Sequence, residues 1–330
     1  MNIEAIASRF KIRIMGLKPL RGVYMAYTDK GPKILKKSKK EPEKLLYIHG
    51  LKEYMYKRGF HNLDRFLISD QGLPFVIDEG NIYIMEDFIS GRESSFINPY
   101  DRSAAMRTLA QLHIHGQGYI PPTGAAERND IGKWEKTYLR KINDLAEIKE
   151  TVKQKKHKDD FDNMFLEDVD FFMEMAWRAY DTLRNSRYKV LCKAAENLKP
   201  ICHHDYTYHN IIIGKEGQIY IIDFDYSCHE LSCYDIAAVI QRVMRRFSYN
   251  IDIAMEMLMD YDRIKPITDD ELILILSQSE FPQRFWRVTD RYYSGKTQWS
   301  KKKFIKKYRE AVEDKIFMLD FVNKFRNIIT

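Results

Sequence analysis

The sequence predicts a bilobal α+β fold, with a small antiparallel sheet and one helix in residues 1–90 and a mainly helical lobe in residues 91–330. Three observations support this prediction. A chain of 330 residues is long for a single hydrophobic core and suits two unequal lobes. Short apolar runs separated by turns fill the first part of the chain, as in hairpins. Long stretches with helical spacing of apolar residues follow from residue 100 onward.

The composition narrows the classes of partner. Apolar residues make up 45% and charged residues 31% of the chain, which is typical of a folded globular protein. The net charge of +7 favours anionic partners such as nucleotides or acidic surfaces. We expect no membrane partner and no signal peptide, hence synthesis in the cytoplasm, because no apolar run is long enough and the N-terminus lacks a basic segment followed by an apolar one. We expect no nucleic-acid partner, since basic and aromatic residues are scattered without a binding motif.

The first lobe is predicted from turns and alternation. A helix over residues 3–10 precedes strand patterns at 12–14, 20–28 and 33–36, the last two joined by a turn at 29–32. A helix over 42–58 begins with Pro42, which is tolerated in a first turn, and stops at Gly59. Short strands at 66–68, 74–77 and 82–85 complete the sheet.

The second lobe is predicted from helical spacing. Helices are expected over residues 100–115, 134–188 with a break near 153–162, 234–247, 281–293 and 302–328. One hairpin interrupts them, because two apolar runs at 211–213 and 219–222 flank a turn that contains Gly214 and Gly217.

Three oxygen-bearing side chains frame this hairpin. Asp205 and Asn210 lie five positions apart on the preceding loop, and Asp223 follows the second apolar run. The hairpin should bring Asn210 and Asp223 together. An acid can accept the proton of an acceptor hydroxyl, and magnesium prefers hard oxygen ligands, so the set matches the needs of phosphoryl transfer. Asp and Asn also serve in caps and turns, but the acid that follows the hairpin favours a site.

These residues carry a family resemblance. Residues 203–210 read H-H-D-Y-T-Y-H-N and residues 222–225 read I-D-F-D. They resemble the H-G-D-x-x-x-x-N loop and I-D-[WF]-[ED] strand of the aminoglycoside phosphotransferase and choline kinase group, of the protein-kinase-like superfamily. The resemblance extends over nearly the whole chain and is nearest to the CotS-like spore coat proteins of endospore-forming bacteria. His204 replaces the usual glycine and residues 207–209 replace a common H-P-G run, which predicts a stiffer loop with an altered substrate side.

The resemblance implies ATP and Mg²⁺ as cofactors. Asp205 would be the catalytic residue that orients or deprotonates the acceptor, and Asn210 and Asp223 would bind the metal. Lys36 matches the strand lysine that contacts the phosphates, and Glu53 lies at the depth expected for its partner. Two simpler readings remain open: Lys36 could belong to a solvated basic run over residues 33–40, and Glu43 is a rival partner explained by the helix dipole.

The nucleotide would also meet two backbone segments. Gly22, in the first turn of the sheet, would lie over the phosphates, although a single glycine makes this a poor glycine-rich loop. Glu86 and Phe88 fall in the segment that resembles the interlobe hinge, where backbone groups bind the adenine edge. The lobe boundary is expected near Ser90.

The function implied is a kinase-like phosphotransferase that uses magnesium and ATP to phosphorylate a small hydroxyl-bearing acceptor, and that is deposited in the spore coat. Its partners would be the nucleotide, the acceptor and other coat proteins. The alternative is a structural coat assembly protein with a kinase-like fold and little or no catalytic activity. A third possibility is a zinc site around Cys202, Cys228 and Cys233, although free packed cysteines explain the same residues.

Overall fold

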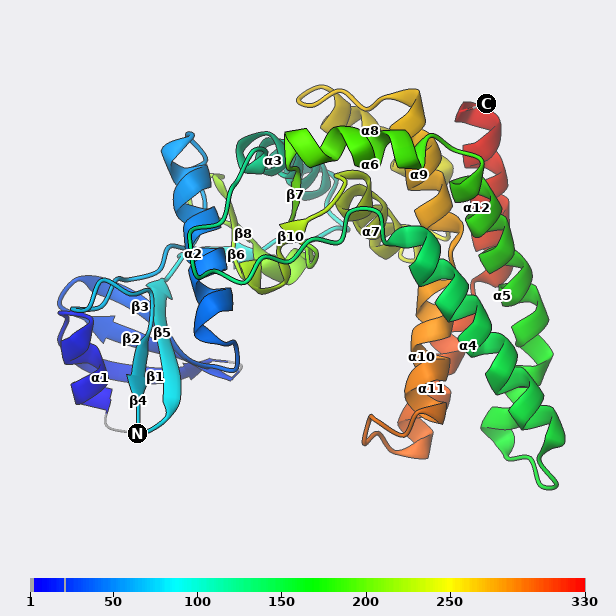
Figure 1. The fold of residues 1–330 in the computed structure, drawn as a ribbon, viewed down its shortest axis with the longest axis horizontal. Coiled ribbons are helices and arrows are strands. Elements are labelled where there is room, and N and C mark those ends of the chain that lie inside the picture. The colour runs from blue at the N-terminus through cyan, green and yellow to red at the C-terminus, as the bar shows by residue number, and fades with distance from the viewer. Residues whose placement is uncertain (1–2, 21, 330) are drawn as a thin grey trace. The chain divides into compact units, whose positions relative to one another are not determined.

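The computed structural model describes residues 3–20 and 22–329 (Figure 1). The chain forms two compact units. The first comprises Met1–Asn129 with Asn197–Ser232, and the second comprises Asp130–Glu196 with Cys233–Thr330. The lobe boundary expected near Ser90 falls inside the first unit, so the division into lobes at that residue stays a prediction.

The first unit begins with a five-stranded antiparallel sheet. Its strands lie in the order β1-β2-β3-β5-β4 and are β1 (Ile14–Leu20), β2 (Val23–Thr28), β3 (Gly31–Ser38), β4 (Val76–Asp78) and β5 (Asn81–Asp87). The small antiparallel sheet expected from the sequence is therefore present. The strand expected at residues 66–68 is reduced to an isolated bridge between Phe66 and Glu86, supported by a hydrogen bond from the Leu67 N–H to the Met85 carbonyl of 2.7 Å.

Strand alternation gives the sheet two different faces. Leu35 and Met85 lie on the face that packs against helix α1 (Ile3–Arg9), in a buried cluster with Ile6 and Phe10. Successive side chains of a strand point to opposite faces, so Lys36 lies on the other side of the sheet. There it is opposite Ile84 of β5.

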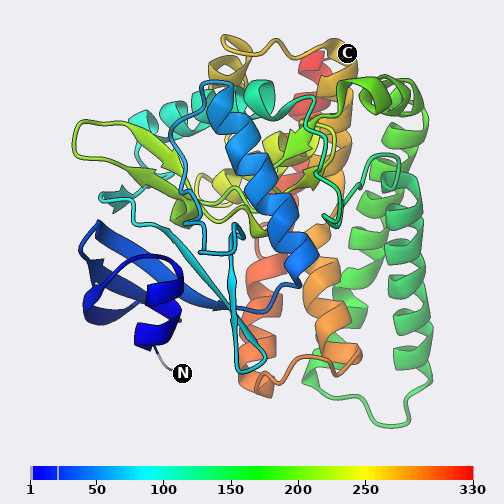
Figure 2. The same ribbon diagram turned by 60° about the vertical axis from the view of Figure 1, so that its left-hand side comes forward.

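Helix α2 (Pro42–Lys57) follows the sheet and is the long blue helix in Figure 2. Pro42 opens it, as expected for a residue that lacks an N–H to donate. Its buried face consists of Leu45, Tyr47, Ile48, Leu51, Lys52 and Met55. Lys52 is the one charged residue on this apolar face, and it is buried as deeply as its neighbours.

The rest of the first unit consists of one long helix and short strands. These are β6 (Arg92–Glu93), α3 (Pro99–Gly116), β7 (Ile201–Cys202), β8 (Ile211–Ile213), β9 (Ile219–Ile221) and β10 (Cys228–His229), with single 3-10 turns η1 (Tyr208–Asn210) and η2 (Phe224–Tyr226). Strands β6, β8 and β9 form one small sheet, and β7 pairs with β10. The hairpin expected at residues 211–222 is the β8–β9 pair.

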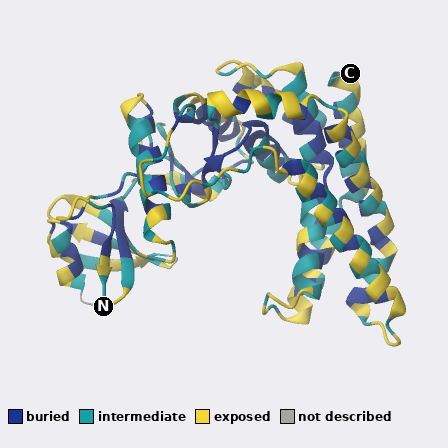
Figure 3. Ribbon diagram, viewed as in Figure 1, coloured by how far each residue is buried: buried dark blue, intermediate teal, exposed yellow. Residues whose placement is uncertain are grey.

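The described residues of the second unit form helices joined by turns and loops. Its helices are α4 (Trp134–Gln154), α5 (Asp160–Arg184), α6 (Tyr188–Leu198, which ends in the first unit), α7 (Cys233–Met244), α8 (Ile251–Asp262), α9 (Asp269–Glu280), α10 (Gln283–Tyr293), α11 (Lys301–Val312) and α12 (Lys315–Ile329). Buried residues, dark blue in Figure 3, line one side of each long helix while the other side is exposed. The helices in the described part of the chain are too short or too polar to cross a membrane.

Candidate active site

The open end of the β8–β9 hairpin brings two predicted metal ligands together. Ile211 is paired with Ile221, and the Ile222 N–H donates to the Asn210 carbonyl at 3.0 Å. Asn210 immediately precedes β8, and Asp223 immediately follows Ile222. The two residues therefore lie on adjacent backbone segments at the same end of the hairpin.

Asn210 also joins Asp205 to this end. Its buried side-chain amide donates from Nδ2 to the Asp205 carbonyl at 2.9 Å and to Asp205 Oδ2 at 3.1 Å. His203 anchors the start of the loop, because its Nδ1 accepts the Asp205 N–H at 3.3 Å and its Nε2 lies 3.1 Å from the Ile222 carbonyl. The loop is thus held against the strand that leads to Asp223.

The Asp223 carboxylate is suited to a divalent cation. Its Oδ1 is buried, and among the described residues it has no hydrogen-bond partner. A buried carboxylate oxygen left without a donor is costly, and Mg²⁺ takes hard oxygen ligands of this kind. Asp223 has a φ of 64°, in the left-handed region that is strained for a residue with a side chain. Asp223 and the Asn210 amide oxygen therefore fit the metal that the sequence motif implies.

The neighbouring His204 has a related backbone conformation. Its φ is 65°, a value that glycine adopts at no steric cost and other residues rarely adopt. The loop therefore requires a left-handed residue at this position. This requirement accounts for the glycine of the related H-G-D motif.

Lys36 lies between two carboxylates. Its Nζ is 3.6 Å from Glu86 Oε2 and 3.7 Å from Asp225 Oδ1. Burial opposes the charge of Lys36, but Glu86, Asp225 and more distant acids outweigh it and raise the pKa of the lysine. Lys40 shares Asp225, with Nζ 3.9 Å from Oδ2. These carboxylates therefore favour the charged form of Lys36, on the face of the sheet opposite α1.

The pair expected between Lys36 and Glu53 does not form, and this prediction was wrong. Glu53 instead accepts two hydrogen bonds from Arg65, at 2.8 Å and 2.7 Å. Consecutive residues of a helix point about 100° apart, so when Lys52 faces inward Glu53 faces sideways. The acids that contact Lys36 are Glu86, on the neighbouring strand, and Asp225.

Lys52 and Asp64 were not predicted as part of the site. Lys52 is 1% exposed, and its Nζ lies 2.7 Å from Glu86 Oε1 and 2.8 Å from Asp64 Oδ1. Burial raises the pKa of Asp64, while the two lysines overcome burial and lower the pKa of Glu86. A lysine within the apolar stripe of residues 45–55 is the sequence signal that could have indicated Lys52.

The remaining predicted nucleotide contacts are placed as follows. Gly22 lies in the β1–β2 turn with a φ of 88°, and a Cβ added to it would meet no atom within 4 Å. Glu86 lies inside β5, where it pairs with Ile34, so its side chain and not a hinge backbone faces the site. Phe88 begins the irregular segment after β5 and is half-buried. A hinge role for Phe88 stays a prediction.

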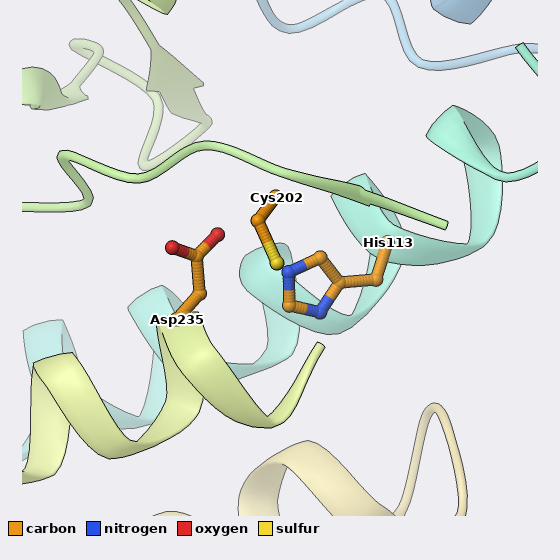
Figure 4. A group of neighbouring side chains, drawn as sticks. All are labelled: His113, Cys202 and Asp235. Carbon is orange, nitrogen blue, oxygen red and sulfur yellow. The ribbon is translucent and has the colours of Figure 1, made fainter. Parts of the chain in front are cut away.

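The cysteines proposed for zinc, Cys202, Cys228 and Cys233, are buried thiols. Cys202 and Cys228 are opposite each other in the β7–β10 pair, and the Cys202 Sγ contacts the Leu231 carbonyl at 3.2 Å. Figure 4 shows the Cys202 side chain beside His113. A ring nitrogen of His113 lies within 4.8 Å of the Cys202 sulfur. In the part of the chain that the structure describes, no group of close ligand atoms combines Cys202, Cys228 and Cys233.

A five-stranded antiparallel sheet, a following helix and a catalytic-type loop with a hairpin define a protein-kinase-like fold. Solved structures with this fold superpose on nearly the whole chain. An aminoglycoside phosphotransferase from Alicyclobacillus acidocaldarius gives a TM-score of 0.86 at 18% identity, over 98% of this chain and 95% of that one. Spectinomycin phosphotransferase in its AMP complex gives 0.65 at 14% identity, over 95% and 96%. The fold class expected from the sequence is confirmed.

Sequence comparison identifies the family. The chain belongs to the family described as "Spore coat putative kinase YutH", whose model matches residues 4–325. It is 23% identical over 286 residues to spore coat protein S of Bacillus subtilis, covering 86% of this chain and 81% of that protein. It is 21% identical over 256 residues to the endospore coat-associated protein YutH of the same organism, covering 76% and 70%. The resemblance to kinase-like spore coat proteins is confirmed.

Proposed function

We propose that this protein is a phosphotransferase of the spore coat that uses ATP and Mg²⁺ to phosphorylate a small hydroxyl-bearing acceptor. One observation carries the proposal: Asp205, Asn210 and the buried free oxygen of Asp223 converge at the open end of one hairpin. Structural neighbours support nucleotide binding, since they include complexes with AMP and with AMP-PNP and Ca²⁺. The names of the sequence relatives support the association with the coat.

The side chains would divide the work as follows. Asp205 would accept the proton of the acceptor hydroxyl. The acceptor oxygen then bonds to the γ-phosphorus of ATP, and ADP leaves. Asn210 and Asp223 hold the metal, which supplies positive charge to the phosphate oxygens when bound. Lys36 contacts the phosphates, and Gly22 allows the first turn of the sheet to approach them closely. Phe88 marks the segment whose backbone would receive the adenine.

Nucleotide binding and hydrolysis test this proposal directly. We expect magnesium with AMP-PNP to raise the melting temperature of the wild-type protein, and magnesium with ATP to be hydrolysed slowly without an acceptor. Asp223→Asn should abolish the magnesium-dependent part of both responses. Asp181→Asn, an exposed acid on α5, is the matched control and should respond as the wild type does. A wild-type protein with neither response would exclude the transferase.

A second function is a coat assembly protein that keeps the fold as a scaffold. The observation that favours it is His204, which occupies a left-handed position where the related catalytic motif has glycine. The two functions differ in what the coat requires. If scaffolding suffices, a sporulating strain with Asp205→Ala should assemble a normal coat while a deletion strain does not. If catalysis is required, the two strains should show the same coat defect.

A further inference from the structure

Lys52 is the most deeply buried charged group near the candidate site. It lies in the middle of α2, and its ammonium group contacts two acids, Glu86 at 2.7 Å and Asp64 at 2.8 Å. The Lys52 Nζ lies 4.5 Å from the centroid of the Phe66 ring and 5.5 Å from the centroid of the Phe224 ring. A buried ammonium group is costly unless it is fully paired, and here both acids are themselves buried.

Each of these acids has a second oxygen that reaches a different part of the site. Glu86 Oε2 lies 3.6 Å from the Lys36 Nζ. Asp64 Oδ2 accepts the Asp223 N–H at 3.4 Å. Lys52 is therefore the centre of a continuous chain of charged contacts that runs from the phosphate lysine to the backbone of the metal-binding acid.

We propose that Lys52 is a positioning residue that fixes Lys36 and Asp223 relative to each other. Lys52 holds the Glu86 carboxylate toward Lys36, and it holds the Asp64 carboxylate under the Asp223 backbone. One cation therefore fixes the positions of the groups on both the phosphate side and the metal side of the site. Lys52 touches neither nucleotide nor metal in this arrangement. The inference rests on the proposed transferase function and names a residue that the sequence motif does not contain.

The electrostatics explain why this cation has a directing role. Without it, Glu86 and Asp64 would be two buried carboxylates that lack a shared partner, and each would be driven to move or to recruit water. Reacting groups tolerate little displacement, since a shift of about 1 Å can cost roughly 100-fold in rate. Replacing Lys52 should therefore displace both the Lys36 ammonium group and the Asp223 carboxylate.

The alternative is that Lys52 only balances charge so that the unit can fold. The two roles differ in selectivity. A folding defect would weaken every ligand of the site alike. A positioning defect would weaken ligands with phosphates and metal, and would leave the binding of the nucleoside part unchanged, because adenosine reaches neither Lys36 nor the metal.

The test compares Lys52→Met, which keeps the length of the side chain without its charge, with Lys57→Met, an exposed lysine on the same helix. Calorimetry measures the dissociation constants of magnesium AMP-PNP and of adenosine for each protein. We expect Lys52→Met to weaken magnesium AMP-PNP by about tenfold or more, a loss comparable to one charge-assisted hydrogen bond, and adenosine by less than about twofold. Lys57→Met should match the wild type for both ligands.

A second variant covers the case in which Lys52→Met does not fold. Asp64→Asn keeps Lys52 paired with Glu86 but removes the ion pair through which Lys52 holds residue 64 under the Asp223 N–H, so it changes only the metal side. It should reduce the gain in AMP-PNP affinity that magnesium provides, with metal-free AMP-PNP unaffected.

The outcomes separate this inference from the proposed function. If the wild type binds magnesium AMP-PNP more tightly than adenosine, and Lys52→Met and Asp64→Asn show the same increase in affinity, the role of Lys52 is refuted and the transferase stands. Equal losses for adenosine and AMP-PNP would reduce Lys52 to a folding role and also refute the inference. A wild type that binds adenosine but gains nothing from phosphates and magnesium would refute the transferase, and the role of Lys52 with it.

Discussion

Lys36 and Glu86 lie on the neighbouring strands β3 and β5, with the Lys36 Nζ 3.6 Å from Glu86 Oε2. One of the two acids beside Lys36 thus comes from the same sheet, and α2 contributes Lys52 where a glutamate was expected. The hydrogen-bonded strands hold the backbones of Lys36 and Glu86 in register, and Lys52 of α2 contacts the other oxygen of the Glu86 carboxylate.

This arrangement predicts which glutamate matters for nucleotide binding. Glu86→Gln removes one of the two acids beside Lys36, so its amine should be held less firmly toward the phosphates. We expect magnesium AMP-PNP to bind roughly tenfold more weakly, as for the loss of one hydrogen bond to a charged group. Isothermal titration calorimetry measures the change.

Glu53→Gln is the matched control for that measurement. Glu53 is bound to Arg65, which is 37% exposed, so its loss should change neither nucleotide affinity nor stability by much. A weaker affinity in Glu53→Gln than in Glu86→Gln would restore the pairing that the sequence suggested.

The left-handed backbone at His204 predicts an order of stability. His204→Gly and His204→Ala both remove the imidazole, so the two variants differ only in how well they tolerate a φ of 65°. Alanine should be less stable than glycine by roughly 1 kcal/mol, the usual cost of a Cβ in this region. Urea unfolding measures the difference. Equal stabilities would mean that the loop adopts another path in solution.

Gly91 precedes β6 and approaches β8 too closely for any side chain. A Cβ at this position would lie 2.3 Å from the Ile213 carbonyl oxygen and 2.8 Å from Ile212 Cγ2. Gly91→Ala should therefore push β6 away from β8 and cost roughly 1–3 kcal/mol, as overpacking does. Gly16→Ala is the control, since its Cβ would meet Tyr27 at an ordinary 3.7 Å. Comparable unfolding midpoints for the two variants would contradict the close approach.

Lys141 in the second unit predicts a dependence of stability on pH. Its Nζ donates to Gln283 and faces the rings of Phe281 and Trp286 at 5.1 Å and 4.9 Å. Burial, with smaller contributions from Arg140 and Arg287 that outweigh Asp144, lowers the pKa of Lys141 to about 7. The unfolded chain therefore binds this proton more tightly than the folded one between about pH 7 and 10.5.

The sign of the effect follows from that difference. The free energy of unfolding of the wild type should rise with pH across this window relative to Lys141→Met, because the penalty of a buried charge disappears as the amine deprotonates. Thermal unfolding near pH 7 and near pH 10 measures the gap, which should favour the variant at the lower pH and shrink at the higher. Lys136→Met, an exposed lysine on the same helix, should show no such trend.

The fold could be predicted from local patterns because most of its elements have strong ones. Alternation and turns indicate β2 to β5, and Pro42 with Gly59 bounds α2 almost to the residue. The strand expected at residues 12–14 covers only the first residue of β1, and helices α6, α8 and α9 were not predicted. The prediction of a strand at residues 66–68 fails because three apolar residues in a row only suggest a strand. Whether it pairs along its length depends on Met85 and Glu86, and the sequence of the triplet contains no information about that pairing.

The site divides in the same way. The convergence of Asp205, Asn210 and Asp223 could be predicted because a loop and a hairpin of fixed length place these residues. Lys52 was missed by one position, since a helix turns about 100° per residue and the pattern of residues 45–55 does not say which charged neighbour faces the sheet. Asp64 could not be found, because it reaches Asp223 through a pairing between residues 159 positions apart.

The contact of Asp225 with both Lys36 and Lys40 has a consequence for how a ligand enters. A triphosphate that approaches Lys36 competes with a carboxylate already held there, and its own negative charge is repelled by that carboxylate. A nucleotide that arrives with its charge partly cancelled by a divalent ion meets less repulsion. Occupancy should therefore depend on the supply of free divalent ions and on ionic strength, and not on the concentration of nucleotide alone.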